Sequence, residues 1–436
     1  MRFRASEVAA AVGGRLTGPD VDVDGAAIDS RLVTGGELFV PVVADRDGHD
    51  FVAAALDAGA AAYLTARRPE GGTAVVVDDT GVALAALGRA ARARLPERVV
   101  AVTGSVGKTS VKDLAGAILR RRGPIAVSAR SFNNELGVPL TLAGAPDGAW
   151  AAVVEMGARA RGDLRLLCSI ARPTVGVVTV VAPVHTETFG TVDDVARAKA
   201  ELVEALPAHG TAVLNADDPR VRAMAEVTVA SVVTFGTTGD ADVAAGAVEL
   251  DAELRASFRL RCPAGEADVR LGVPGRHQIG NALAATAAAL AAGATLDDVV
   301  RGLEEARLSD WRMALGRSPD GALVLNDAYN ANPTSTGAAL RALAELDAKR
   351  RVAVLGTMAE LGETSAGDHR EVAALAADLG IRVVAVAEPA YGAELVDDVD
   401  AAVEALGPLG HGDAVLVKGS RVAGLERLAA RLLGAG

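Results

Sequence analysis

A glycine-rich segment at residues 102–110 has the composition and spacing of a phosphate-binding loop. Its sequence is Val102-Thr103-Gly104-Ser105-Val106-Gly107-Lys108-Thr109-Ser110. An apolar run precedes it and a helical pattern follows it, which is the strand–loop–helix context that such a loop requires. The two glycines allow backbone N–H groups to converge on phosphate oxygens, and the helix N-terminus adds its dipole. Lys108 would bridge the β- and γ-phosphates of a nucleotide, and the Thr109 hydroxyl would ligate Mg²⁺.

This segment is shorter than the form G-x-x-x-x-G-K-[ST], because position 102 is valine. The alternative interpretation is a glycine-rich turn followed by a chance Lys-Thr pair. The motif predicts nucleotide binding and does not by itself choose a reaction.

Two further side chains are candidate metal ligands because each follows an apolar run. Glu155 lies at the carboxyl end of AAVVEMG, the edge of an α/β sheet where ligands bind, so its carboxylate could share a Mg²⁺ with Thr109. The alternative is a strand-end glutamate that is only solvated. His185 ends the predicted strand VGVVTVVAPV, although a lone histidine is more often structural than a ligand.

Lysine usage indicates a third candidate. Of the 44 basic residues, the only lysines are Lys108, Lys112, Lys199, Lys349 and Lys418. A lysine kept in an arginine-rich chain indicates a position that needs a compact ammonium or an amine that can lose its proton. Lys199 lies on the predicted helix VARAKAELVEAL, where a solvated face is the ordinary interpretation. A deprotonated Lys199 could instead react with carbon dioxide, and the carbamate would be an anionic oxygen ligand for Mg²⁺.

The elements that must position these groups predict an α/β chain with three domains. Residues 1–82 alternate short strands and helices, and residues 83–311 contain apolar runs typical of a mostly parallel sheet. Within the second segment, residues 240–273 alternate at period two, as an antiparallel excursion would. Residues 312–436 predict a doubly wound domain, but they contain no G-x-G-x-x-G for a dinucleotide.

Composition excludes several classes of protein. The chain has 436 residues, a formal net charge of −12 and 3% aromatic residues, which disfavours a nucleic-acid partner because such partners require a basic face and stacking platforms. Two cysteines are too few for a disulfide framework. No apolar stretch approaches the roughly 20 residues that span a bilayer, and the N-terminus does not resemble a signal peptide. We therefore expect a soluble, cytoplasmic protein with no membrane span.

Several motifs together are similar to those of the Mur ligase family, the ATP-dependent amide ligases of bacterial cell-wall precursor synthesis. The resemblance covers essentially the whole chain. It rests on DSRLVTGGELFVPV and DGHDF in the first domain, on TGSVGKTS, SFNNELGVPLTL, VVEMGARARGDL, VHTETFGT, ARAKAEL, LNADDP and PGRHQIGNALAA in the second, and on LNDAYNANPTSTGAAL, VLGTMAELGETSAGDH and VLVKGSR in the third. It implies a UDP-sugar-binding domain at 1–82, a central ATP-binding domain at 83–311 and a C-terminal ligase domain at 312–436.

The resemblance also implies roles for individual residues. Lys108 and Thr109 would hold the phosphates and a first Mg²⁺ with Glu155, while His185 and a carbamylated Lys199 would hold a second Mg²⁺. The nucleotide would be contacted by Asn281 at the adenine, Arg312 at the γ-phosphate, and Asp327 at the ribose with Tyr329 and Asn330 beside it. The site for the UDP-sugar peptide would be lined by Ser30, Asn133 and Asn134, and the reaction centre would be faced by Lys418 and Ser420.

Each of these residues also has a structural interpretation. Asn281 could be the N-cap of the Ala-rich helix NALAATAAALAAG. Asp327 and Asn330 could cap the next helix or form an Asx turn. Arg312 could form a surface ion pair, and Lys418 could lie on an exposed strand tip.

Asp217 and Asp218 look like a metal pair, but DDP after a strand is more often a turn or a cap, which is the interpretation that we adopt. The sequence also departs from the family pattern. Asn326 and Ala328 flank Asp327 where the family more often has Asp and Ser, and Thr357 stands where Asp is usual.

The runs NNELGVP, DAYNANP and AELGETSAGDH resemble the family member that joins D-alanyl-D-alanine to UDP-N-acetylmuramoyl-tripeptide. The DNPR-type signature of the diaminopimelate-adding member is absent. The resemblance implies ATP, two Mg²⁺ ions and carbon dioxide, as the lysine carbamate, as cofactors, and a monomer as the usual state. The alternatives are a sister ligase that adds the third-position diamino acid, a P-loop phosphotransferase, and a nucleotide-binding regulator without turnover.

Overall fold

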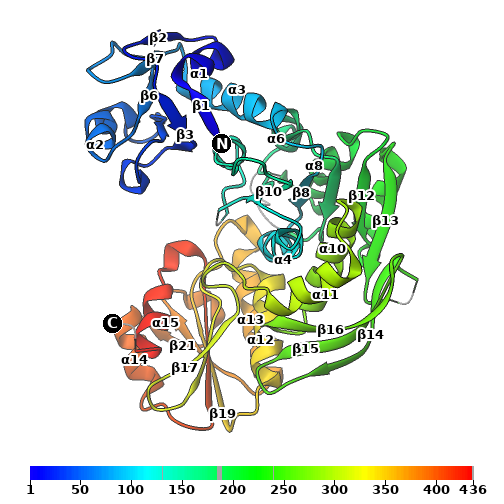
Figure 1. Ribbon diagram of the computed structural model, residues 1–436. Coiled ribbons are helices and arrows are strands. Elements are labelled where there is room, and N and C mark those ends of the chain that lie inside the picture. Colours follow the sequence, from blue (N-terminus) through cyan, green and yellow to red (C-terminus); the bar gives the residue numbers. More distant parts are fainter. Residues whose placement is uncertain (130, 184–188, 239, 435–436) are drawn as a thin grey trace.

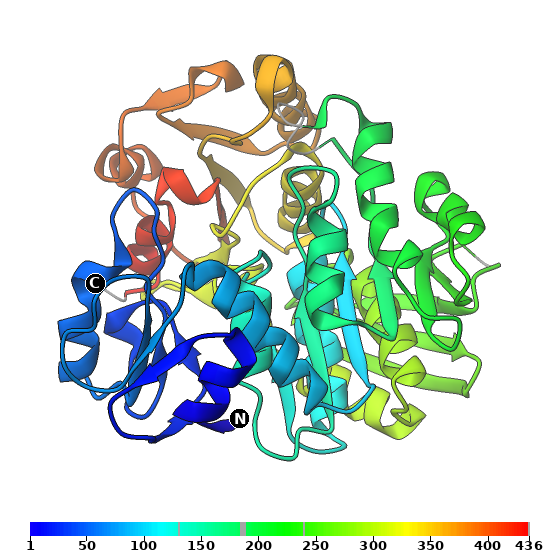
Figure 2. The same cartoon turned by 90° about the horizontal axis from the view of Figure 1, so that it is seen from above.

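The computed structural model describes residues 1–129, 131–183, 189–238 and 240–434. They form an α/β molecule with sheets of five, nine and six strands and one two-stranded ribbon. In Figure 1 the N-terminal unit lies at the top, the central unit on the right and the C-terminal unit at the lower left; Figure 2 shows the same units from above. The expected α/β class with mostly parallel sheets is confirmed.

The N-terminal sheet has the order β2-β7-β6-β5-β4, and only β2 pairs antiparallel. Its strands are β2 (Arg15–Thr17), β4 (Ala26–Ala27), β5 (Leu38–Phe39), β6 (Ala62–Thr65) and β7 (Ala74–Val76). The unit also contains the ribbon of β1 (Arg2–Arg4) and β3 (Asp22–Asp24), the helices α1 (Ala5–Val12) and α2 (Val52–Asp57), and the 3₁₀ turns η1 (Ser30–Leu32) and η2 (Gly48–Phe51). Ser30 therefore begins a 3₁₀ turn of this unit, which Asp29 caps by accepting from the Arg31 N–H.

Helix α3 (Thr80–Ala93) connects the first unit to the second. Asp79 caps it by accepting from the N–H groups of Gly81 and Val82. Its buried face packs against α1 and against α5 (Gly137–Ala143) and α6 (Asp163–Ala171) of the central unit. The predicted boundary between residues 82 and 83 falls within the first turn of α3, and it stays a prediction, as does the boundary between 311 and 312.

The central sheet has the order β16-β15-β14-β13-β12-β11-β8-β10-β9. The pairs from β9 across to β14 are parallel, whereas β14, β15 and β16 pair antiparallel, as the period-two pattern predicted. Its strands are β8 (Val99–Thr103), β9 (Ile125–Val127), β10 (Ala151–Glu155), β11 (Val175–Val178), β12 (Thr211–Asn215), β13 (Ser231–Gly236), β14 (Val243–Leu250), β15 (Arg255–Cys262) and β16 (Gly265–Pro274). Its other helices are α4 (Lys108–Arg120), α8 (Val192–Glu204), α9 (Pro219–Arg222), α10 (Gln278–Ala291) and α11 (Leu296–Glu305), with the 3₁₀ turn η3 (Ala223–Val227).

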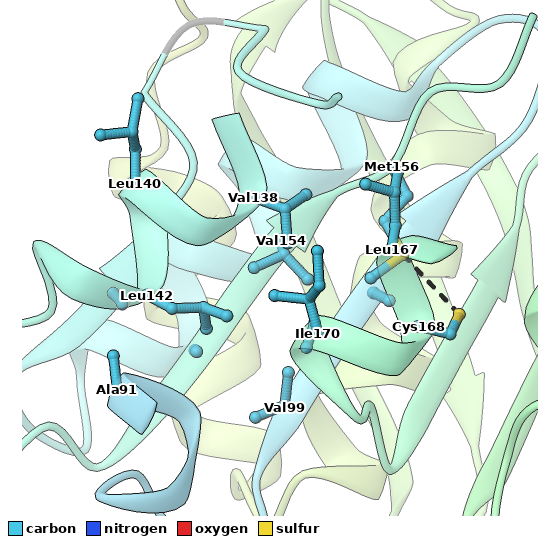
Figure 3. Packing of buried hydrophobic residues seen from close by; sticks show 14 of the residues in the cluster. Ala91, Val99, Val138, Leu140, Leu142, Val154, Met156, Leu167, Cys168 and Ile170 are labelled. Atoms are coloured by element: carbon cyan, nitrogen blue, oxygen red, sulfur yellow. Dashed lines mark hydrogen bonds between the residues drawn. The ribbon is translucent and has the colours of Figure 1, made fainter. Parts of the chain in front are cut away.

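Alternation along β8 divides its side chains between the two faces of the central sheet. Val99 and Ala101 belong to one core, whereas Val100 and Val102 belong to a second core with residues of α4, α10 and α11. Figure 3 shows the first core, in which Val99 lies among side chains from α3, α5 and α6. Because both faces are buried, the run VVAV is apolar throughout. The two cores fix the end of β8, where the phosphate loop begins.

One strand is shorter than the sequence predicted. β11 ends at Val178, so the expectation that this strand continues to His185 is wrong. The chain leaves the sheet because its backbone groups bind elsewhere. The Val180 carbonyl accepts from the Ser105 N–H at 2.7 Å, and the Val181 N–H donates to the Asp218 carboxylate at 2.7 Å. The segment after β11 therefore supports the phosphate loop.

The interpretation of Asp217 and Asp218, which follow β12, as a turn or a cap is confirmed. Asp218 caps α9 by accepting from the N–H groups of Arg220 and Val221. The Asp217 carboxylate accepts hydrogen bonds from the backbone and hydroxyl groups of Thr237 and Thr238. Both side chains thus hold loops at the end of the central sheet.

The C-terminal sheet has the order β17-β18-β22-β19-β20-β21, and only β17 pairs antiparallel. Its strands are β17 (Ala314–Arg317), β18 (Leu323–Asn326), β19 (Arg350–Leu355), β20 (Arg382–Val386), β21 (Glu394–Val396) and β22 (Asp413–Lys418). Its helices are α12 (Pro333–Glu345), α13 (Ser365–Asp378), α14 (Val399–Leu406) and α15 (Glu426–Leu432), with the 3₁₀ turns η4 (Gly362–Thr364), η5 (Pro389–Tyr391) and η6 (Arg421–Ala423). Because β18 and β22 are parallel neighbours, Asp327 and Lys418 lie at the same edge of this sheet. None of the helices described in any unit is long and apolar enough to cross a bilayer.

Candidate active site

A cavity of about 430 Å³ lies between the central and C-terminal units. The site residues expected from the sequence that line it are Gly104, Ser105, Val106, Gly107, Lys108, Thr109, Ser110, Asn133, Asn134, Glu155, Lys199, Asn281, Arg312, Asp327, Tyr329, Asn330 and Lys418. The other expected residues that the structure describes, Thr103, Ser30 and Ser420, are not part of this lining. His185 lies outside the described residues. The cavity therefore brings together segments that are more than 300 residues apart in the chain.

The phosphate loop is held in one conformation by its own side chains and by the segment after β11. Gly104 and Gly107 have φ values of +140° and +87°, which favour glycine. The Lys108 ammonium donates to the Gly104 carbonyl at 2.8 Å, and the Ser105 hydroxyl donates to the Ala182 carbonyl at 3.0 Å. Burial lowers the pKa of Lys108 below its usual range, against the attraction of Glu155. Thr103 lies beneath the loop, where its hydroxyl donates to the Met156 carbonyl.

Replacing Gly104 by alanine is expected to lower the free energy of unfolding by about 1–3 kcal/mol, the cost of a strained backbone. The added Cβ would also collide with the Thr179 hydroxyl. We expect nucleotide affinity to fall about tenfold, which corresponds to about 1.4 kcal/mol. Thermal unfolding and calorimetric titration with ADP measure both effects. The matched control is Gly148→Ala, since Gly148 has a φ of +69° and no atom within 4 Å of an added Cβ. A Gly104→Ala protein that binds ADP like the wild type would contradict this assignment.

Two side chains that could supply oxygen ligands to a metal lie directly beside the loop. The Thr109 hydroxyl donates to Glu155 Oε2 at 2.6 Å, and the Asn133 side-chain amide donates to Glu155 Oε1 at 2.8 Å. Glu155 is only 1% exposed, so the interpretation of a solvated strand-end glutamate is wrong. A hydroxyl and a carboxylate are hard donors of the kind that Mg²⁺ prefers, and Mg²⁺ commonly takes only one or two protein ligands beside phosphate oxygens.

Clusters of side chains that commonly bind metals were also sought. Within the part of the chain that the structure describes, no group of three or more His, Cys, Asp or Glu side chains is placed to hold a metal ion.

Lys199 enters the cavity from α8 and is only 2% exposed, so the interpretation of a solvated helix face is wrong. Its ammonium nitrogen lies 5.9 Å from the centre of the Phe189 ring. Burial and the nearby charge of Lys108 lower the pKa of Lys199 to about 7. A substantial fraction of the amine is therefore neutral near pH 7, which is the form that reacts with carbon dioxide.

Arg312 reaches the cavity from the connection between the two units. Its guanidinium carbon lies 4.2 Å from the centre of the Tyr329 ring, a cation–π contact. Its Nε is buried without a hydrogen-bond partner in the described structure. No ion pair joins Arg312 to any described residue, so the surface ion-pair interpretation finds no support. A buried cationic donor that lacks a partner beside a phosphate loop is suited to an anionic ligand.

Lys418 forms a buried ion pair at the edge of the C-terminal sheet. Its ammonium lies 2.5 Å from Asp327 Oδ2 and donates to the Asn330 carbonyl at 2.8 Å. Lys418 is only 2% exposed, so the interpretation of an exposed tip is wrong. The following helix is capped by Asn332, so the interpretation of Asp327 or Asn330 as its cap is wrong as well.

Asn281 lies inside α10, which begins at Gln278, so its interpretation as the helix N-cap is wrong. Its side-chain amide donates to Gln278 Oε1 at 2.8 Å. A Cβ at Gly107 would lie 2.5 Å from Asn281 Oδ1, which shows how closely this side chain approaches the phosphate loop. Gln278 also lines the cavity, but an amide next to a helix start carries no distinctive signal in the sequence.

The sequence also did not predict two contacts across the cavity. The Ser131 hydroxyl bonds to the Tyr329 hydroxyl, and Arg159 lies 3.8 Å from Glu360, so both contacts join the central and C-terminal units. Ser420 lies behind the cavity, where its hydroxyl accepts from the Ala359 N–H at 2.9 Å. These pairings depend on how two units face each other, and no local pattern in the sequence encodes that.

Comparison with known proteins places this site in a family. Residues 102–289 match the Mur ligase middle domain, and residues 311–421 match the family described as Mur ligase, glutamate ligase domain. The chain therefore belongs to the Mur ligase family, and the resemblance drawn from its motifs is confirmed. Within that family it is similar to the UDP-N-acetylmuramoyl-tripeptide–D-alanyl-D-alanine ligase of Mycobacterium bovis, with 40% identity over 99% of this chain and 98% of the relative.

Solved structures extend the likeness to all three units. The fold is similar to a crystal structure of MurF from Acinetobacter baumannii, with a TM-score of 0.88 and 31% identity over 100% of this chain and 99% of that one. It is also similar to the MurF ligase of Thermotoga maritima in complex with ADP, with a TM-score of 0.82 and 28% identity over 95% of this chain and 98% of that one.

Proposed function

We propose that this chain joins D-alanyl-D-alanine to UDP-N-acetylmuramoyl-tripeptide by an ATP-dependent amide bond, in the synthesis of peptidoglycan precursors. The observation that carries the proposal is the cavity, in which a phosphate loop and a lysine of lowered pKa face an arginine from a second unit. Identity of 40% over nearly the full length to a ligase with this activity favours these substrates over those of the sister ligase.

The reaction requires activation because a carboxylate is a poor electrophile. The terminal carboxylate oxygen of the tripeptide attacks the γ-phosphorus of ATP, the bond to the β-phosphate oxygen breaks, and an acyl phosphate and ADP form. The amine of D-alanyl-D-alanine then attacks the acyl carbon and loses a proton, and inorganic phosphate leaves. No side-chain nucleophile is required.

The residues of the cavity supply positive charge where the phosphoryl group is transferred. Backbone N–H groups of the loop and Lys108 hold the phosphates on one side, and Arg312 approaches from the other. Thr109 and Glu155 would hold a first Mg²⁺, and a carbamylated Lys199 would hold a second together with His185, which lies outside the described residues. These ions, when bound, withdraw negative charge from the transferring group.

The remaining expected residues surround the nucleotide and the UDP-sugar peptide. Asn281 contacts the adenine, and Asp327, Tyr329 and Asn330 contact the ribose side of the nucleotide. The UDP-sugar peptide extends toward the N-terminal unit past Asn133, Asn134 and Ser30. Lys418 faces the reaction centre at its C-terminal edge, and Ser420 supports that edge from behind the cavity. Enclosure between two units protects the acyl phosphate from water.

The experiment that tests this function is phosphate release with ATP, UDP-N-acetylmuramoyl-tripeptide and D-alanyl-D-alanine, with each substrate omitted in turn. We expect release only when all three are present. Release without the dipeptide, or transfer of phosphate to an alcohol without free phosphate, would refute the assignment. A parallel assay with the UDP-N-acetylmuramoyl-dipeptide and diaminopimelate tests the sister activity. Phosphate release in that assay would identify the chain as the sister ligase.

The proposal includes a monomeric enzyme that works in the cytoplasm. Size-exclusion chromatography with light scattering tests the monomer, and a mass corresponding to two chains would refute it. Fractionation of cells that express the chain tests the location.

A further inference from the structure

Residues 309–313, here named the strap, carry Arg312 from the central unit into the C-terminal unit. The start of the strap is held by the central unit. Asp113 of α4 accepts hydrogen bonds from the Ser309 N–H at 2.7 Å and from the Ser309 hydroxyl at 2.8 Å, both on Oδ2. One carboxylate oxygen thus accepts from both hydrogen-bond donors of a residue 196 positions away.

The end of the strap is held by the C-terminal unit. The Tyr329 N–H donates to the Trp311 carbonyl at 3.2 Å, and the Met313 N–H donates to Asp327 Oδ1 at 3.1 Å. Trp311 and Met313, on either side of Arg312, have φ values of +59° and +52°. Such values are unfavourable for residues with a Cβ and persist only where surrounding contacts impose them.

The anchor at Asp113 is itself fixed by a buried lysine. The Lys112 ammonium lies 2.7 Å from Asp113 Oδ1 and donates to the Ser128 carbonyl at 2.9 Å. Lys112 is only 1% exposed. The Ser128 hydroxyl in turn accepts from the Glu155 N–H at 3.1 Å. The carboxylate that holds the strap is therefore connected to the strand end that carries Glu155.

The anchor also lies on the helix that begins with the phosphate loop. Lys108 is the first residue of α4 and Asp113 lies in its second turn, so a single rigid element joins them. We propose that Asp113 is a positioning residue for Arg312: it ties the strap to α4, so that the guanidinium keeps a fixed place relative to the phosphate loop of the opposite unit. The inference rests on the proposed function for the role of Arg312 at the phosphate, and on the described contacts for the anchoring itself.

Two variants test the anchor at different strengths. Ser309→Ala removes only the hydroxyl contact and leaves the pair of Lys112 with Asp113 in place. Asp113→Asn removes the charge that binds the strap and Lys112. We expect kcat for phosphate release to fall about tenfold in Asp113→Asn and less in Ser309→Ala, with KM for ATP nearly unchanged, because misplacing a catalytic group by a fraction of an ångström lowers the rate at saturation.

A matched control exists elsewhere in the central unit. Asp242 Oδ2 accepts from the Thr234 N–H at 2.8 Å and from the Thr234 hydroxyl at 2.7 Å, the same pair of contacts at a place that does not line the cavity. Asp242→Asn should therefore lower thermal stability less than Asp113→Asn, because Asp242 is exposed, and should leave kcat unchanged. An equal loss of kcat in Asp242→Asn would overturn the proposal, since the effect would then be a general loss of stability.

A second readout does not depend on ligase activity. The chain has two tryptophans, so Trp150→Phe leaves Trp311 of the strap as the sole reporter. The Trp311 ring lies 4.4 Å from the Arg421 guanidinium carbon, and its emission will respond when the strap moves. In this background we expect Asp113→Asn to shift the emission to longer wavelength and to increase quenching by acrylamide, with no change in Asp242→Asn.

The two readouts separate the possible results. Changed Trp311 emission together with a loss confined to kcat supports the proposal. Unchanged emission and unchanged kcat in Asp113→Asn would overturn it, and so would a loss that appears mainly in KM for ATP. If the wild-type chain releases no phosphate with all substrates present, the proposed function fails, and Trp311 emission alone still decides whether Asp113 anchors the strap.

Discussion

Lys199→Ala is expected to lower kcat for phosphate release at least about 100-fold, because a direct metal ligand should matter at least as much as the outer residues whose loss costs 10- to 100-fold. Without the lysine amine no carbamate can form, and the anionic oxygen ligand proposed for the second Mg²⁺ is lost. Lys199→Arg should be as inactive, since arginine keeps the positive charge and cannot form a carbamate. Steady-state phosphate release at saturating substrates measures both.

The same lysine predicts how activity depends on pH. Its pKa of about 7 means that the neutral amine becomes the main form as the pH rises through 7. The neutral nitrogen attacks carbon dioxide, forms an N–C bond and loses a proton, which leaves a carbamate anion. Carbamylation and activity should therefore increase from pH 6 to 8, and ¹³C NMR with labelled bicarbonate should show one carbamate signal that is absent in Lys199→Ala.

The matched control is Lys349→Ala, which removes an exposed lysine. It should leave both the rate and the carbamate signal unchanged. Full activity in Lys199→Ala, or the carbamate signal persisting in it, would refute the role given to this lysine.

Arg312→Ala is expected to lower kcat on the order of 10³-fold, the lower end of the effect of an arginine that approaches a transferring phosphoryl group. The half-buried Arg312 side chain faces the cavity with a buried, unpartnered Nε, so this donor is free to bind an anionic group. Arg312→Lys should recover only part of the rate, because an ammonium lacks the planar fork and stacks less well on Tyr329. Single-turnover measurements of acyl phosphate formation locate the loss in the first chemical step.

Affinity should change much less than rate. We expect KM for ATP to change by no more than about threefold in Arg312→Ala, because the charge that Arg312 offsets develops mainly in the transition state. The exposed Arg317, which is the last residue of β17 and lies five positions after Arg312, provides the control Arg317→Lys. Normal turnover in Arg312→Lys would count against the phosphate role.

Much of the fold could be predicted from the sequence because its signals are local. The apolar run VVAV predicted β8 since each of its faces meets a separate core, and the period-two segment predicted the antiparallel strands β14 to β16. The prediction failed for β11, which looked apolar through residue 184 but ends at Val178. There the backbone bonds to the phosphate loop and to Asp218, and composition does not reveal such competition.

By itself, the sequence determined the phosphate loop. Gly104, Gly107, Lys108 and Thr109 are contiguous, and a strand, a tight turn and a helix N-terminus form from residues within a few positions of one another. Its motifs also sufficed to identify the family.

Only the tertiary structure decided what surrounds that loop. Lys199 acquires a low pKa because distant segments bury it beside Lys108, Lys418 pairs with Asp327 from 91 residues away, and Asp113 reaches Ser309 across 196 positions. Desolvation and charge pairing depend on distances in space, which the chain sets only when its three units pack. For that reason the chemistry of the loop could be inferred from a short stretch of letters, whereas the environment that tunes it could not.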